Sequence, residues 1–299
     1  ALAIESAKAA GFERIIVGAT EHDSIRENAK ASGLPVEVWP VDRLGVADLV
    51  WLKTALATSG KALVCLMLAN NETGVIQPVT KASILVREAG GWLHVDAIQA
   101  AGKIDIDFNA LGADTLSLSA HKLGGPQGVG ALAAGPRSTL SRRLHGGGQE
   151  RGRRAGTENG PGIAGFGAAA EAASVEAMEA QAAWRDAFAA QAAALGAEIL
   201  GEGARRLPQT LCLALPGYGA ELQVMGMDLA GVMISAGSAC SSGKVKPSHV
   251  VEAMGRADLA PYAIRLSGGW ATTEQDWDRA GEAWRELAAR HQARRKAVA

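Results

Sequence analysis

Short apolar runs alternate with stretches of helical periodicity through the first half of the chain. The apolar run at 62–68 is continuous, as expected for a strand buried on both faces. Elsewhere apolar positions recur at helical spacing, as at Leu49, Leu52 and Leu56. This alternation predicts βαβ units, and therefore an α/β fold with a mostly parallel sheet covered by helices on both faces. The predicted strands are 15–17, 36–39, 62–68, 92–95, 115–118 and 129–133, and the predicted helices are 24–31 and 79–89.

The pattern changes after about residue 160. Apolar positions from Ile163 to Ile199 fit one long helical region that is bent or broken along its length. Shorter elements follow, and a capping-box-like pattern at Thr273 and Asp276 opens a last helix. We therefore expect two domains, residues 1–175 and a smaller α+β domain at 176–299. The predicted elements of the second are strands at 211–215, 232–235 and 263–267 and a helix at 221–229.

The amino-acid composition argues against several classes of protein. The chain has 299 residues, of which 48% are hydrophobic, which is enough for about two domains. Thirty basic against 31 acidic residues give a net charge of −1, which argues against nucleic acid or a membrane surface as the main partner. Three cysteines without a C-x-x-C pattern indicate neither a disulfide framework nor a zinc site. We expect a cytoplasmic protein that binds no metal.

A glycine-rich loop follows the predicted strand at 115–118. Taken alone, Lys122 at the start of this loop would be a surface lysine. Ser119 and His121, however, place hydrogen-bond donors for a phosphate beside its amine, and the four glycines that follow let the backbone approach a planar ligand. This combination is what a lysine needs to form a Schiff base with pyridoxal 5'-phosphate.

Two further strand ends carry polar groups. Asp96 directly follows the predicted strand at 92–95, at the edge where α/β sheets bind ligands, and would keep a pyridine nitrogen protonated. Gln99 follows three residues later and could bond a phenolic oxygen. The turn that contains Asn70 and Asn71 follows the strand at 62–68. Taken alone, Asp96 could be a helix cap and the segment with Asn70 and Asn71 an ordinary Asn-rich turn. Together with the loop that contains Lys122, these strand ends favour a cofactor site.

The cysteines differ in their surroundings. Cys65 and Cys212 lie in apolar strands, which is typical of inert buried thiols. Cys240 lies instead in a small, polar segment with Lys244 and Lys246 nearby, where a cation favours the thiolate. The pattern indicates that Cys240 is the nucleophile.

At five places, in order along the chain, the sequence resembles the NifS/IscS-type cysteine desulfurases, which belong to the class V branch of fold type I pyridoxal-phosphate enzymes. The resemblance implies their seven-stranded type of sheet. The matching segments are 70–78, 94–99, 119–122, 146–157 and 237–242.

The resemblance assigns the cofactor contacts residue by residue. In the family a histidine stacks on the cofactor ring, and His22 matches it and is a candidate for handling protons. Asn71 and Gln99 match groups near the phenolic oxygen, and Asp96 matches the partner of the pyridinium nitrogen. The phosphate ligands and the Schiff-base lysine are matched by Ser119, His121 and Lys122.

The resemblance also implies substrate and partners. Arg265, with Asn71, matches the clamp on the carboxylate of L-cysteine, a task that suits the bidentate geometry of arginine. Lys122 would move the α-proton, and the Cys240 thiolate would attack the substrate sulfur, leaving alanine and a persulfide. A sulfur acceptor or iron–sulfur scaffold protein would then receive the sulfur. Thr157 matches a residue that reaches the neighbouring subunit's phosphate, which implies a homodimer.

The N-terminus departs from this pattern. The family is longer there by roughly 80 residues, which include a first strand and a turn that holds the cofactor phosphate at a helix N-terminus. We therefore expect a large domain that is incomplete at its N-terminus. Alternative functions are a selenocysteine lyase, another class V aminotransferase, or an inactive fragment that acts as a scaffold.

Overall fold

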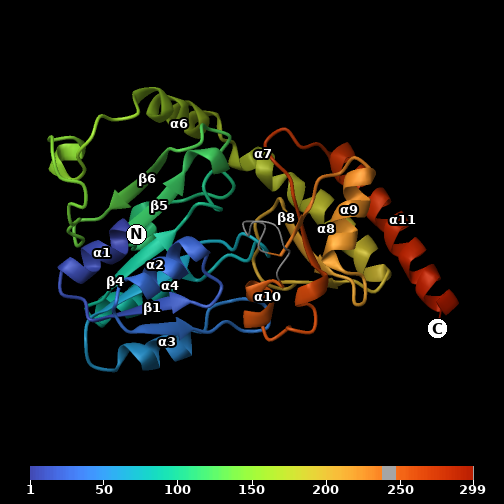
Figure 1. Ribbon diagram of the computed structural model, residues 1–299, viewed down its shortest axis with the longest axis horizontal. Coiled ribbons are helices and arrows are strands. Elements are labelled where there is room, and N and C mark those ends of the chain that lie inside the picture. Colours follow the sequence, from blue (N-terminus) through green and yellow to red (C-terminus); the bar gives the residue numbers. More distant parts are fainter. Residues whose placement is uncertain (238–246, 299) are drawn as a thin grey trace. The chain divides into compact units, whose positions relative to one another are not determined.

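A computed structural model of the protein describes residues 1–237 and 247–298 (Figure 1). The chain divides into two compact units. The first comprises residues 1–40, 47–69 and 77–173. The second comprises the chain from residue 174 onward together with 41–46 and 70–76. Two short segments of the N-terminal half thus belong to the second unit, which the sequence pattern did not predict.

Six strands form the sheet of the first unit within the described residues. Their order is β2-β1-β3-β4-β5-β6, and all neighbours are parallel except β6, which runs antiparallel to β5. The mostly parallel sheet is therefore confirmed. The strands are β1 (Arg14–Gly18), β2 (Val36–Trp39), β3 (Ala62–Met67), β4 (Trp92–Asp96), β5 (Thr115–Ser119) and β6 (Gly130–Ala134).

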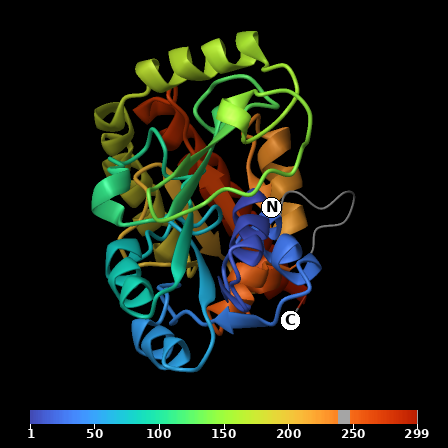
Figure 2. The same cartoon turned by 90° about the vertical axis from the view of Figure 1, so that its left-hand side faces the viewer.

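Helices cover both faces of this sheet, as predicted. On one face, Ile4 of α1 and Ile25 of α2 pack with Leu63 and Cys65 of β3. On the other face, α4 packs against β3 and β4, and Figure 2 shows it opposite α1 and α2 across the sheet. The helices of this unit include α1 (Leu2–Ala9), α2 (Asp23–Ala31), α3 (Leu49–Leu56), α4 (Val79–Glu88), α5 (Phe108–Leu111) and α6 (Gly160–Ala172).

The second unit contains an antiparallel sheet with the strand order β7-β8-β10-β9. Its core includes Phe188 of α8 and Trp277 and Trp284 of α11, packed with Leu211 and Leu213 of β8. The α+β character predicted for this part is present. The elements are α7 (Val175–Glu179), α8 (Gln181–Ala194), β7 (Glu198–Ile199), β8 (Thr210–Ala214), α9 (Ala220–Leu229), β9 (Ser235–Ala236), α10 (His249–Ala253), β10 (Ala263–Ser267) and α11 (Glu274–Val298).

The helical region is broken, as the sequence analysis expected, and the structure gives the positions of the breaks. Ala173 is extended, with φ −67° and ψ 127°, between α6 and α7, where Ser174 caps α7, and Ala180 lies between α7 and α8. Two other element predictions need correction. Gly196 follows α8 with a φ of +87°, so Ile199 lies on β7 and not on a helix. The strand predicted at 232–235 is the shorter β9 at Ser235–Ala236.

The capping box at the start of α11 is present as predicted. The backbone N–H and hydroxyl of Thr273 each donate to Asp276 Oδ2 at 2.8 Å, and the Asp276 N–H donates to Thr273 Oγ1 at 3.3 Å. This reciprocal pattern satisfies backbone donors at the helix start. It fixes the first turn of a helix that contributes Trp277 and Trp284 to the core.

The buried His94 on β4 makes stability depend on pH. Its Nδ1 lies 2.9 Å from Thr115 Oγ1, and burial lowers its pKa to about 4. In the unfolded chain a histidine titrates at about 6.5, so below that pH the unfolded state binds a proton that the folded state does not. The contribution of the neutral, buried His94 to stability is therefore complete above pH 6.5 and is lost as the pH falls toward 4. We expect the free energy of unfolding to fall by up to about 1.4 kcal/mol for each pH unit between these two pKa values. Urea unfolding at about pH 7.5 and about pH 5 measures this loss.

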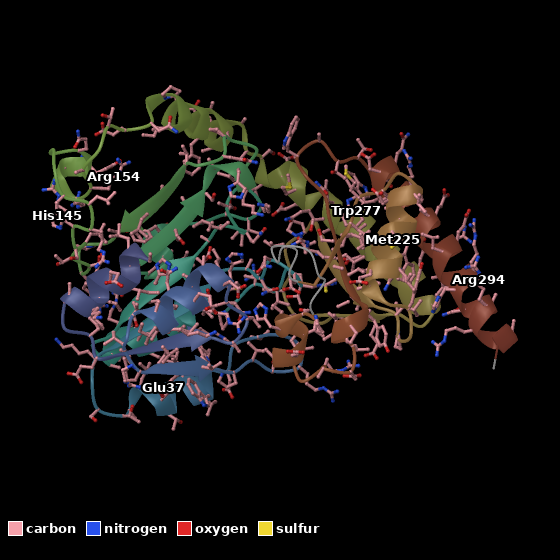
Figure 3. All side chains as sticks on the ribbon, viewed as in Figure 1. Glu37, His145, Arg154, Met225, Trp277 and Arg294 are labelled. Atoms are coloured by element: carbon pink, nitrogen blue, oxygen red, sulfur yellow. The ribbon has the colours of Figure 1, made fainter. Side chains whose placement is uncertain are left out.

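Comparison with His94→Asn isolates this contribution, because asparagine keeps a polar partner for Thr115 but does not titrate. The free energy of unfolding of His94→Asn should change less with pH than that of the wild type. His145, exposed between β6 and α6 (Figure 3), supplies the matched control, and His145→Asn should keep the wild-type pH dependence. Equal pH dependence in His94→Asn and the wild type would contradict the prediction.

Candidate active site

The carboxyl ends of the parallel strands bring the predicted cofactor groups to one edge of the first sheet. His22 follows β1, Asp96 ends β4, and Ser119 ends β5. Because β1, β3, β4 and β5 are parallel neighbours, their following residues share this edge. Gln99, half-buried, lies in the turn after β4, and Lys122 ends the short 3₁₀ helix η1 (Ala120–Lys122). The fold thus gathers groups that are far apart in the sequence.

Asp96 is a buried carboxyl group at the centre of this edge. Its side chain is 6% exposed, and Oδ1 accepts a hydrogen bond from the Ile98 N–H at 2.9 Å. Burial raises the pKa of Asp96, while the Ile98 N–H and then the charge of His22 lower it. A cationic N–H placed against this carboxylate would relieve the cost of burying its charge.

His22 has a structural task that sequence reasoning missed. Its Nδ1 accepts a hydrogen bond from the Ser24 N–H at 3.1 Å and lies 2.9 Å from Ser24 Oγ, so His22 caps the N-terminus of α2. A ring nitrogen that accepts from a backbone N–H carries no proton, so the neutral ring carries its proton on Nε2. The cap fixes both the ring and its tautomer.

Ser119 and His121 interact directly at the end of β5. Ser119 Oγ lies 2.8 Å from His121 Nδ1, which brings together the two predicted phosphate ligands. Lys122 follows with an exposed side chain. The glycine at the end of the loop has a backbone role, because a Cβ on Gly130 would lie 2.7 Å from the Leu118 carbonyl oxygen. Gly130 therefore allows β6 to pair with β5, independently of any ligand.

Glu21 is a second buried acid at this edge, and sequence reasoning missed it. It is 1% exposed, and its Oε1 accepts a hydrogen bond from the Met67 N–H at the end of β3. Burial and then the charge of Asp96 raise the pKa of Glu21 well above its usual value. The available signal was a charged residue immediately before His22, in the segment that follows an apolar strand. Glu21 links the ends of β1 and β3.

The second unit brings the predicted substrate-binding pair together. Arg265 on β10 donates from Nη1 to the Asn71 carbonyl oxygen at 2.7 Å and from Nη2 to Ser235 Oγ at 3.1 Å. Ser235 is its cross-strand neighbour on β9. Both Arg265 and Asn71 are half-buried. The guanidinium group is therefore held in a defined orientation beside Asn71.

A buried carboxylate–hydroxyl pair lies next to Asn71 in the chain. Ser248 Oγ donates to Glu72 Oε2 and accepts from the Val251 N–H at 3.1 Å, so Ser248 also caps α10. Glu72 is 3% exposed. Sequence reasoning missed this pair, since 176 residues separate its members. The pair ties the segment at 70–76 to the second unit.

The described cysteines are unsuited to nucleophilic attack. Cys65 and Cys212 are free and buried, and burial raises the pKa of both thiols far above the neutral range. Neither can supply a thiolate to a substrate at neutral pH. Cys240, with Lys244 and Lys246, lies outside the described residues.

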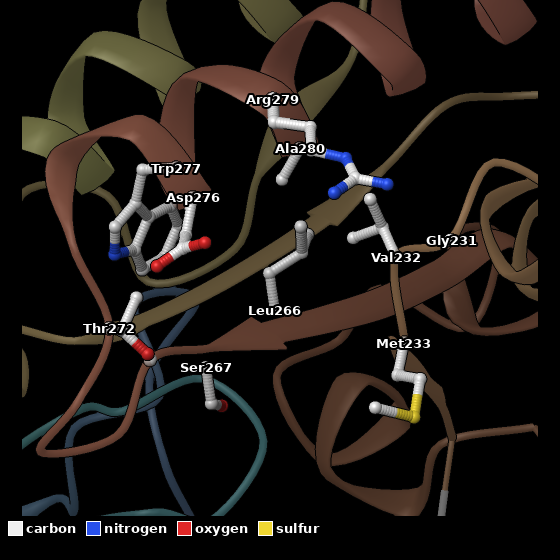
Figure 4. Close-up of a pocket in the computed structure, with 11 residues that line it drawn as sticks. Gly231, Val232, Met233, Leu266, Ser267, Thr272, Asp276, Trp277, Arg279 and Ala280 are labelled. Atoms are coloured by element: carbon white, nitrogen blue, oxygen red, sulfur yellow. The ribbon is translucent and has the colours of Figure 1, made fainter.

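Neither Thr157 nor the lining of one pocket in the second unit includes a residue that ends a strand of the first sheet. Thr157 is exposed between the 3₁₀ helix η2 (Glu150–Gly152) and α6, in the part of the chain that carries Arg154 (Figure 3). In the second unit, a cavity of about 280 Å³ is lined by apolar residues and glycines and by the polar residues Ser267, Thr272, Asp276 and Arg279 (Figure 4). Asp276 already belongs to the capping box, and the lining includes none of the predicted site residues.

A metal-binding cluster and a membrane-spanning helix are both absent from the part of the chain that the structure describes. In residues 1–237 and 247–298, no group of three His, Cys, Asp or Glu side chains is arranged to hold a metal ion. Within the same ranges, no helix is long and apolar enough to cross a membrane.

Comparison with known proteins gives consistent matches over nearly the whole chain. The family model for class V aminotransferases matches residues 2–279. A cysteine desulfurase from Cereibacter sphaeroides is 41% identical over 286 residues, which cover 93% of this chain and 74% of that protein. The cysteine desulfurase IscS of Dictyoglomus turgidum is 37% identical over 273 residues, which cover 88% of this chain and 69% of that protein. The crystal structure of a NifS-like protein from Rickettsia africae superposes with a TM-score of 0.83 at 30% identity. The superposition covers 95% of this chain and 78% of that protein.

Proposed function

Because this chain belongs to the class V aminotransferase family and, within it, to the NifS/IscS-type cysteine desulfurases, we propose that it converts L-cysteine to L-alanine and carries the sulfur as a persulfide on Cys240. The family implies pyridoxal 5'-phosphate as cofactor. The observation that carries the proposal is the group of side chains at the carboxyl edge of the first sheet, with buried Asp96 at its centre and Lys122 beside the Ser119–His121 pair.

The residues at this edge fit the chemical groups of that cofactor. Asp96 is buried with its pKa raised by burial, so it favours a partner that brings a cationic N–H, as a pyridinium does. Ser119 and His121 supply adjacent donors for a phosphate. Lys122 supplies an exposed primary amine for the aldehyde.

When bound, the cofactor withdraws electrons from the α-carbon of an attached amino acid. In the proposed reaction, the chain controls protons around this carbon. Lys122 accepts the α-proton on its amine and later returns a proton. Asp96 would hold the pyridine nitrogen of the cofactor in its protonated form. Asn71 and Gln99 would hydrogen-bond the phenolic oxygen of the bound cofactor. His22 would lie against its ring and would donate protons from Nε2, the nitrogen left available by its cap on α2.

Arg265 is the proposed clamp for the substrate carboxylate, together with Asn71. Its two bonds to the Asn71 carbonyl and Ser235 Oγ fix the guanidinium plane before substrate binds. A fixed plane lowers the entropy lost when two parallel N–H groups bind one carboxylate. This arrangement selects an α-amino acid by its carboxylate, and the thiol of the substrate is then selected by its reaction with Cys240.

The sulfur step transfers one sulfur atom without an external oxidant. The Cys240 thiolate attacks the sulfur of the substrate, an S–S bond forms, and the bond from sulfur to the substrate Cβ breaks. The electron pair of that bond remains on the substrate carbon, which takes up a proton and becomes the methyl group of alanine. Cys65 and Cys212 cannot take this role, because both are buried and their pKa values are raised by burial.

The same proposal includes the partners. The protein acts as a homodimer in which Thr157 reaches the phosphate in the neighbouring subunit, and its exposed position after η2 is compatible with such a contact. The persulfide sulfur passes to an acceptor protein for iron–sulfur clusters or other sulfur compounds. The free thiols of Cys65 and Cys212 fit the reducing conditions of the cytoplasm.

Incubation of the protein with pyridoxal 5'-phosphate, L-cysteine and a thiol reductant tests the proposal. We expect equal amounts of alanine and sulfide, because each turnover releases one of each. Alanine is measured by chromatography and sulfide by its conversion to a dye. Formation of a keto acid in place of alanine would identify an aminotransferase. Turnover of selenocysteine but not of cysteine would identify a lyase for selenium, and absence of cofactor binding would favour the scaffold alternative.

A further inference from the structure

A second lysine contacts the main chain of Lys122. Lys103 lies in the turn that follows β4, and its Nζ donates to the Lys122 carbonyl oxygen at 3.1 Å and to the Ala101 carbonyl oxygen at 3.4 Å. Lys103 is half-buried and Ala101 is 8% exposed. The amine therefore joins the chain after β4 to the end of η1. Both segments belong to the first unit.

The packing around this contact is close. Gly102 has a φ of +71°, and a Cβ at this position would lie 2.5 Å from Leu123 Cδ2 and 3.1 Å from Ala173 Cβ. Only glycine allows the turn to lie directly against the residue that follows Lys122. The position of Lys103 is thus determined by the same turn that contacts the end of η1.

Burial of this amine has a cost that its hydrogen bonds offset. Burial and then the charge of Lys122 lower the pKa of Lys103 to about 8. A lysine without hydrogen-bond partners in the protein would extend into solvent, away from the charge of Lys122. Lys103 instead donates to two main-chain carbonyl groups. Hydrogen bonds from a charged donor to a carbonyl are stronger than neutral ones, so the contact resists opening of η1.

We propose that Lys103 is a positioning residue for Lys122: it holds the Lys122 main chain in the position from which the Lys122 amine reaches the cofactor aldehyde. This inference rests on the proposed function for the role of Lys122. The main-chain contact itself is independent of that function. Lys103 bonds the Lys122 carbonyl and not its amine, so it restrains the start of the side chain and leaves the amine free to react.

Three variants separate the possible roles of Lys103. Lys103→Met removes the donor and the charge, Lys103→Arg keeps both, and Lys103→Gln keeps a neutral donor. Lys53→Met serves as the matched control, because Lys53 is an exposed lysine on α3. The first measurement is the rate at which added pyridoxal 5'-phosphate becomes bonded to Lys122, followed by absorbance, fixed with borohydride and located by peptide mass spectrometry.

We expect Lys103→Met to slow this bond formation about tenfold, the effect of losing one charged hydrogen bond. Lys103→Arg should restore the rate to within about threefold of the wild type, and Lys53→Met should match the wild type. A role limited to overall stability would not be restored selectively by arginine. If Lys103→Met does not fold, Lys103→Gln takes its place and should be slowed to an intermediate extent.

The second measurement uses the cofactor-free chain, so that it does not depend on the proposed function. Amide hydrogen exchange should become faster at Leu123, whose N–H donates to the Ala120 carbonyl oxygen in η1, in Lys103→Met but not in Lys103→Arg. Unchanged exchange in Lys103→Met and Lys103→Gln would overturn the inference. If exchange responds but the wild type forms no bond at Lys122, the proposed function fails and the positioning of the Lys122 main chain stands.

Discussion

Replacement of Lys122 by alanine should abolish the visible absorbance band of the cofactor-loaded protein and lower alanine production by about 10⁴-fold, the upper range for a positioned acid–base group. The structure places this exposed amine at the end of η1, directly after the Ser119–His121 pair. Without the amine, no covalent bond to the aldehyde forms, and no base remains at this position for the α-proton. Absorbance, borohydride fixation and the alanine assay measure the three consequences separately.

The controls distinguish loss of one amine from general damage. Lys53→Ala, on the exposed side of α3, should keep both the band and the activity. Lys122→Arg keeps a positive charge but cannot form the covalent bond, so it should fail like Lys122→Ala. A retained band in Lys122→Ala would show that another lysine bonds the cofactor, and peptide mapping would then identify Lys103 or a more distant residue.

Much of the fold was predictable because the sheet has a strong sequence signal. Strand β3 is buried along its whole length, so its residues form an unbroken apolar run. The start of α11 was predictable because Thr273 and Asp276 interact locally. Breaks in the helical region were expected, but their positions were not, since alanine fits any helix and the break at Ala173 is a backbone conformation. The local signal for a new helix start was Ser174, whose side chain accepts from the Ala177 N–H.

The site was predictable at the level of strand ends but not at the level of contacts. Polar residues after buried strands placed Asp96 and Lys122 at one edge, because parallel strands share their carboxyl ends. The contacts of Glu21 with Met67 and of Lys103 with the Lys122 carbonyl join residues 46 and 19 positions apart. No periodicity encodes such pairs. A charged residue beside an apolar run was the available signal for Glu21.

The two units also show why short motifs mislead about domains. The Asn-rich segment at 70–76 follows β3 directly, so the sequence associated it with the first sheet. In the structure it belongs to the second unit, held there by the Arg265 bond to the Asn71 carbonyl and by the Ser248–Glu72 pair. Each of these contacts spans more than 170 residues. The sequence pattern therefore assigned β3 to the correct unit but not the turn that follows it.

Replacement of Cys240 by alanine should leave the visible band of the bound cofactor unchanged and lower sulfide and alanine production from L-cysteine to below about 1% of the wild type, since the attacking group is lost. The band depends on Lys122 and Asp96, which this change leaves intact. The other two thiols cannot replace Cys240, because burial raises the pKa of Cys65 and Cys212 far above neutral. Cyanide treatment and mass spectrometry of the wild type should find the transferred sulfur on the peptide that contains Cys240.

Cys212→Ala is the matched control for the loss of Cys240. Cys212 is buried on β8 opposite Arg265 on β10, so its removal changes packing without removing an accessible thiol. We expect Cys212→Ala to unfold at a slightly lower urea concentration, by about 1 kcal/mol of stability, and to keep producing sulfide. Wild-type sulfide production by Cys240→Ala would contradict the persulfide mechanism. Loss of production in Cys212→Ala with an intact fold would place a thiol function on β8, against the burial that keeps this thiol protonated.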